Sequence, residues 1–109
     1  MPKHEFGIMK CAPAKGKIFE KYEPLKYNCI SVDDEYILPL LEPLSNELFY
    51  WHTIDVTGKG LAYCGITLIS PKSAGVLHNL TANTVELSEL TQLLDFAIEH
   101  SYFVIYFGI

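Results

Sequence analysis

Arginine is absent from the chain, and all eight basic residues are lysine. Arginine carries the planar fork that binds a carboxylate or phosphate through two parallel hydrogen bonds. An anionic group can therefore be held here only by lysine point charges, by backbone N–H groups or by a helix N-terminus. A lysine-favouring, AT-rich genome is the simpler explanation of the absence.

Cysteine is scarce: Cys11, Cys29 and Cys64 are widely spaced, and no two form a C-x-x-C pair. This pattern is neither a disulfide framework nor a zinc signature, and it fits unpaired thiols in a reducing compartment. A membrane span needs about 18 consecutive apolar residues, and no apolar run in the chain approaches that length. The first residues lack the apolar core of a secretory signal. We therefore expect a cytoplasmic protein with no membrane partner, no cofactor and no metal.

Charged residues make up only 19% of the chain, whereas 50% of the residues are hydrophobic and 13% are aromatic. Disordered chains need low hydrophobicity and high net charge, so this composition excludes disorder. A length of 109 residues predicts one domain over residues 1–109. Surface scaling predicts that roughly two-thirds of the unfolded surface becomes buried.

The net charge of −5 is unevenly distributed. Residues 33–109 carry ten acids and two lysines, and an acidic body of this kind repels a phosphate backbone, so we expect no nucleic-acid partner. The same charge would suit a basic protein partner. Residues 1–32 are basic and could contact an anion, but their lysines are scattered, which favours a solvated surface: Lys3, Lys10, Lys15, Lys17, Lys21 and Lys26.

Apolar periodicity and turn residues predict the elements. Strands are expected over 5–10, 27–32, 47–55, 61–69 and 102–107, with a weak one over 17–22 and a glycine loop over 56–60. A helix over 34–45, started by Asp33, is interrupted by Pro39 and Pro43. Ser70 and Pro71 start a second helix, and a third covers 86–100.

This order predicts an α+β fold: a ferredoxin-like βαββαβ sandwich over residues 27–107, with an additional N-terminal arm or strand over 1–26. In such a sandwich the helices cover one sheet face, and the last strand lies at an edge. The aromatic excess indicates that the second face is also buried, by the arm or by a second copy of the chain. An apolar edge strand favours pairing with another chain, so we expect a homo-oligomer.

The candidate ligand-binding residues are Tyr50, His52, Tyr63 and Thr67. Alternation along two paired strands predicts that they share one sheet face, with a dent where Gly65 lacks a side chain. Histidine is the usual acid or base near neutral pH, and tyrosine could orient a ligand. The competing interpretation is a half-buried face with a hydrogen-bonded histidine. Cys64 is expected on the opposite face as a small core residue, which argues against a thiol–His52 dyad.

Catalytic and nucleotide-binding motifs are missing, including G-x-S-x-G, H-E-x-x-H and G-x-G-x-x-G. Gly58-Lys59-Gly60 lacks the Walker pattern and is predicted to be a turn. We therefore expect a non-catalytic protein-interaction or regulatory module that self-associates. The alternative is a small-molecule-binding protein or small enzyme that uses the Tyr50/His52/Tyr63 face as its pocket.

Overall fold

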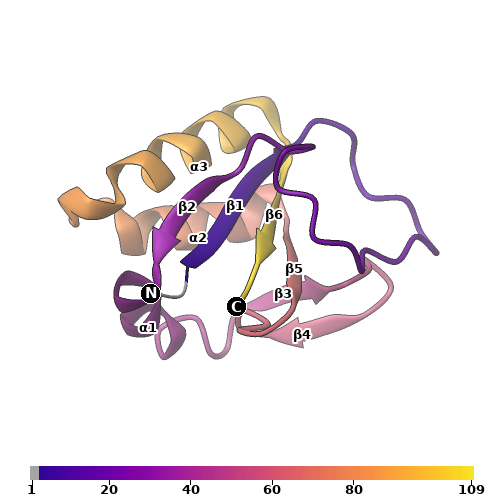
Figure 1. Cartoon of the computed structure of the whole chain (residues 1–109), viewed down its shortest axis with the longest axis horizontal. Coiled ribbons are helices and arrows are strands. Elements are labelled where there is room, and N and C mark those ends of the chain that lie inside the picture. The colour runs from indigo at the N-terminus through magenta and orange to yellow at the C-terminus, as the bar shows by residue number, and fades with distance from the viewer. Residues whose placement is uncertain (1–2) are drawn as a thin grey trace.

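The computed structural model describes residues 3–109, in which six strands form one antiparallel sheet accompanied by three α-helices (Figure 1). Met1 and Pro2, part of the predicted arm, lie outside the described residues. The strand order is β2-β1-β6-β5-β3-β4. The strands are β1 (Lys3–Met9), β2 (Ile30–Asp33), β3 (Leu48–Trp51), β4 (Thr57–Lys59), β5 (Ile66–Ile69) and β6 (Phe103–Phe107). The helices are α1 (Asp34–Leu41), α2 (Pro71–Thr81) and α3 (Ser88–His100), the last preceded by the 3₁₀ turn η1 (Val85–Leu87).

The α+β class is confirmed, but the ferredoxin-like strand order is not. β1 lies between β2 and β6, and β6 lies between β1 and β5, so the last strand is central instead of lying at an edge. β1 is an interior strand that is buried on both faces, with Phe6 0% and Met9 4% exposed. The expected apolar edge strand was therefore wrong.

The helix starts follow the sequence closely. The side chain of Ser70 accepts a hydrogen bond from the Ser73 N–H, and Pro71 follows it at the first position of α2. Asp33 is the N-cap of α1 but makes no side-chain capping hydrogen bond. α1 contains Pro39 and ends at Leu41, four residues earlier than predicted.

The predicted strands 47–55 and 61–69 are both shorter in the structure. β3 ends at Trp51 because His52 has a φ of 63°, in the left-handed region where a strand cannot continue. Residues 57–59, predicted to be loop, form β4 and pair with β3. β5 begins only at Ile66, although it is antiparallel to β3 as expected.

Both sheet faces are covered, as the aromatic excess predicted. One core cluster joins the sheet to residues of α1, α2 and α3, and a second joins the opposite face to Phe19 and Tyr27. These two residues belong to the covering segment, residues 10–29, which contains no helix or strand and therefore lacks the weak strand expected over 17–22. The covering segment crosses β1 at Gly7, where a Cβ atom would lie 2.6 Å from the Tyr27 Cβ. No helix within residues 3–109 is long and apolar enough to cross a membrane.

Candidate functional site

The four predicted site residues do not share one face. Trp51 pairs with Thr67 and Tyr50 pairs with Leu68, so Tyr50 faces the covering segment while Thr67 faces the helices. This is a one-residue shift from the expected register, and such a shift exchanges the two faces. All four residues of β5 are buried, so the apolar pattern could not indicate which face a residue occupies.

His52 is the predicted site residue most firmly held by the covering segment. Its Nδ1 lies 3.1 Å from the Phe19 carbonyl oxygen, and its own carbonyl oxygen accepts a 2.7 Å hydrogen bond from the Phe19 N–H. A Cβ on residue 65 would lie 2.9 Å from His52 Nε2. The expected dent at Gly65 is therefore filled by the His52 ring, and His52 anchors the covering segment to the sheet.

Tyr63 and Thr67 serve other contacts. The turn at residues 61–65 is held by Thr67, which is fully buried and whose Oγ1 accepts a 2.9 Å hydrogen bond from the Ala62 N–H. Tyr63 lies in that turn and donates from its hydroxyl to Asp34 Oδ1 at 2.5 Å. The structure thus brings Tyr50 and His52 to the covered face and directs Tyr63 and Thr67 elsewhere.

Cys64 is exposed, which corrects the expectation of a buried core residue. It follows Tyr63 in the irregular turn, where strand alternation no longer applies. Cys64 and His52 both line a hollow of about 360 Å³ at one end of the sheet. The His52 Nδ1–H donates to the Phe19 carbonyl, which leaves Nε2 as the acceptor nitrogen, but among residues 3–109 no hydrogen bond joins His52 to the Cys64 thiol.

A buried polar cluster that the sequence did not predict joins His4, Asp34, Tyr63 and Tyr106. His4 and Tyr106 are both 0% exposed. His4 Nδ1 lies 2.6 Å from the Tyr106 hydroxyl, and His4 Nε2 lies 2.7 Å from Asp34 Oδ1. These bonds tie β1, α1, β6 and the 61–65 turn together at one point.

Protonation in this cluster follows from its hydrogen bonds. A carboxylate only accepts, so His4 Nε2 donates to Asp34, and in the neutral ring Nδ1 then accepts from the Tyr106 hydroxyl. The hydrogen bond from Tyr63, followed by that from His4, lowers the pKa of Asp34. The same bond to Asp34 raises the pKa of Tyr63 to about 12, and burial raises the pKa of Tyr106.

The cluster has the hydroxyl–imidazole–carboxylate order of a catalytic triad. Its hydroxyl, however, belongs to Tyr106, whose complete burial leaves no route for a substrate. We therefore assign the cluster to stability. The sequence separation of 102 residues between His4 and Tyr106 explains why no local pattern could have found it.

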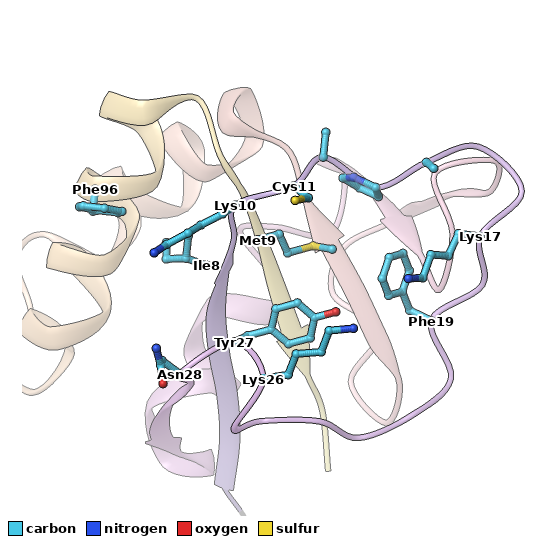
Figure 2. A pocket seen from close by; sticks show the side chains of 13 residues that line it. Ile8, Met9, Lys10, Cys11, Lys17, Phe19, Lys26, Tyr27, Asn28 and Phe96 are labelled. Carbon is cyan, nitrogen blue, oxygen red and sulfur yellow. The ribbon is translucent and has the colours of Figure 1, made fainter.

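A hollow of about 630 Å³ is lined by the covering segment, by the end of β1 and by Phe96 of α3 (Figure 2). This volume falls in the range of small-molecule sites. We call it the lysine groove. Its apolar lining comes mainly from Ile8, Met9, Phe19, Tyr27 and Phe96.

Three lysines line the lysine groove: Lys10, Lys17 and Lys26. Among residues 3–109 the groove lining contains no acidic side chain, and the ion pairs present involve Lys3, His4 and His78 instead. The Lys17 ammonium lies 5.3 Å from the Phe19 ring centroid, and the Lys26 ammonium lies 5.5 Å from that of Tyr27. The groove is therefore a cationic, partly aromatic site on a chain of net negative charge.

The signal for this groove was present in the sequence as the basic character of residues 1–32. Those lysines are exposed, as expected, but the fold of the covering segment brings three of them around one hollow. Within residues 3–109, no group of three or more His, Cys, Asp or Glu side chains is arranged to hold a metal ion. Comparison with protein-family models, with curated proteins and with solved structures found no match for the chain.

Proposed function

We propose that the protein is a non-catalytic binding protein whose lysine groove takes a small organic anion with an apolar body. The observation that carries the proposal is the lining: three lysines without an acidic partner around an apolar and aromatic floor. An anion there would meet ammonium groups, and its apolar part would leave water. This proposal retains the small-molecule class considered from the sequence but moves the site from the Tyr50/His52/Tyr63 face to the groove.

The groove contains little that supports catalysis. Its lining in the described chain holds no histidine or carboxylate to move a proton, and its one thiol is that of Cys11. Binding alone therefore accounts for the residues present.

A fluorescence titration with 8-anilinonaphthalene-1-sulfonate, an aromatic anion, tests the proposal. The double variant Lys17→Gln, Lys26→Gln removes two groove charges, and we expect its dissociation constant to be about threefold to tenfold higher than that of the wild type. The double variant Lys21→Gln, Lys59→Gln removes the same charge outside the groove and should bind like the wild type. Equal weakening in both double variants would show a general charge effect and refute the groove as the site.

Self-association is a second proposal, supported now by the covering segment instead of by an edge strand. Ile18 is 61%, Tyr22 63% and Leu25 91% exposed, three large apolar side chains within eight residues. Analytical ultracentrifugation tests it, and a strict monomer at high concentration would refute it. The three free thiols support the predicted reducing, cytoplasmic environment, which also stays a proposal.

A further inference from the structure

The second half of β1 has a neighbouring strand on one side only. β6 pairs with residues 5–9, whereas β2 pairs only with residues 3–6. Two residues further along, the β1–β2 register would place Asn28 opposite Ile8, but Asn28 has a φ of 49°, in the left-handed region, and β2 begins only at Ile30. Within the described chain, the edge of β1 beyond Phe6 is therefore open on the β2 side.

The backbone groups of Ile8 and Lys10 face this open edge. The Gly108 N–H donates to the carbonyl of Gly65, which lies opposite it when the β5–β6 register is continued. Bonded residues alternate along an antiparallel pair, so the odd-numbered residues of β6 bond to the odd-numbered residues of β1. The N–H and C=O groups of Ile8 and Lys10 consequently point the other way, where no backbone group of residues 3–109 bonds to them.

Side chains of a suitable kind flank the open edge. Ile8, Lys10, Asn28 and Phe96 line one hollow, and Figure 2 shows all four on the side of β1 away from Tyr27. Phe96 is 43% exposed and Ile8 is only partly buried, so an apolar side chain would lose water against both. Lys10 is exposed and takes part in none of the ion pairs described within residues 3–109.

We propose that the open edge of β1 binds an extended segment of a partner protein, which adds a strand in line with β2 and antiparallel to β1. Unpaired N–H and C=O groups on a strand edge are satisfied by such a segment, and side-chain contacts give it specificity. Every strand pair of the sheet is antiparallel, which favours the same direction here. This proposal goes beyond the binding of a small anion.

The register predicts the side chains of the partner segment. Residues directly opposite each other in an antiparallel pair share one sheet face. The partner residue opposite Ile8 would contact Ile8 and Phe96 and should be apolar, and the one opposite Lys10 should be acidic. Read from its N-terminus, the segment is therefore acidic–x–apolar. It must end or turn after the apolar residue, because the chain resumes at Cys29 on the line of β2.

NMR titration of the isotope-labelled protein with acetyl-Glu-Val-Leu-amide tests the proposal. We expect the amide signals of Ile8 and Lys10 to shift. N-methylation of the peptide leucine removes an N–H that would bond to Ile8, and it should weaken binding at least about threefold. N-methylation of the valine, whose N–H would face away from β1, should leave the affinity nearly unchanged. The reversed peptide acetyl-Leu-Val-Glu-amide has the same composition and should bind more weakly.

Charge reversal tests the contact with Lys10. Lys10→Glu should weaken binding of acetyl-Glu-Val-Leu-amide about threefold to fivefold and should make acetyl-Lys-Val-Leu-amide the tighter ligand, because the two side chains would lie directly opposite each other. Lys21→Glu changes the same charge on the covering segment but outside the lining of the hollow. It is the matched control and should leave the preference for the glutamate peptide unchanged.

Several outcomes would overturn the proposal. Equal effects of the two N-methylations, or tighter binding of the reversed peptide, would exclude the antiparallel strand. No shift of Ile8 and Lys10 at millimolar peptide would exclude docking at this edge. Concentration-dependent shifts of both amides in the protein alone, without peptide binding, would identify a second copy of the chain as the occupant. The dye titration uses Lys17 and Lys26, whose side chains lie on the other side of β1, so the two proposals can fail separately.

Discussion

Replacing Tyr106 by phenylalanine isolates the buried polar cluster with the smallest change of shape. The variant removes the hydroxyl that lies 2.6 Å from His4 Nδ1, and both side chains are 0% exposed. Water cannot take the place of the hydroxyl without moving packed side chains. His4 therefore keeps a buried ring nitrogen without its partner, and that loss costs about 1–3 kcal/mol.

This cost converts into a measurable change in melting temperature. An unfolding entropy of about 2.1 cal/mol/K per residue over 109 residues gives a shift of about 4 °C for each kcal/mol. We therefore expect Tyr106→Phe to melt about 4–13 °C below the wild type in thermal unfolding followed by circular dichroism. Tyr102→Phe removes a partly exposed hydroxyl at the start of the same C-terminal region and serves as the control, with little change expected.

A second comparison decides whether burial or bond length determines how much stability is lost when a hydroxyl of the cluster is removed. The Tyr63 hydroxyl makes the shorter bond, 2.5 Å to Asp34, but Tyr63 is partly exposed and water can replace its hydroxyl. Tyr63→Phe should therefore lower the melting temperature less than Tyr106→Phe does. A larger loss in Tyr63→Phe, or no loss in Tyr106→Phe, would refute the assignment of the cluster to stability through burial.

Three further predictions concern other contacts. The pKa of Asp34 is lowered from its usual value of 3.8, so the ionised carboxylate stabilises the fold above that pH. The difference in unfolding free energy between wild type and Asp34→Asn should therefore be full at neutral pH and should disappear as the pH falls through the lowered pKa. Urea unfolding at a series of pH values measures this difference. Gly65→Ala places a Cβ 2.9 Å from His52 Nε2 and should speed proteolysis of residues 10–29. Gly75→Ala, whose Cβ meets nothing within 4 Å, is the control and should leave the rate of proteolysis unchanged. Equal rates in both variants would contradict the close contact. Burial, followed by a nearby carboxylate, raises the pKa of Cys29 to about 12, so in the native protein it should react with Ellman's reagent far more slowly than the two exposed cysteines, and three equal rates would contradict this.

Local signals in the sequence predicted the elements that depend on neighbouring residues. Ser70 and Pro71 start α2 where expected, and the leucine periodicity of residues 86–100 corresponds to η1 and α3. The strand ends were less predictable. The aromatic run from residue 47 continues past Trp51 without interruption, and only the left-handed φ of His52 shows that β3 has ended.

Long-range pairing was beyond the sequence. The interior position of β1 depends on pairing with both β2 and β6, which no local pattern encodes. The site prediction failed for the same reason: β5 is buried on both faces, so its apolar residues could be assigned to either one. The sequence identified the four candidate site residues, but the groups that they contact in the fold belong to segments distant in the sequence.

The covering segment links the candidate site to the stability of the fold. It is irregular and is attached to the sheet by a small set of hydrogen bonds: Phe19 with His52, the Gly16 N–H with Asp55, and the Tyr22 hydroxyl with Glu5. Three of its lysines also line the lysine groove. Under the proposed function, an anion would contact lysines that belong to this segment as well as residues of the sheet. Binding of the proposed anion should therefore stabilise the covering segment against unfolding by mass action.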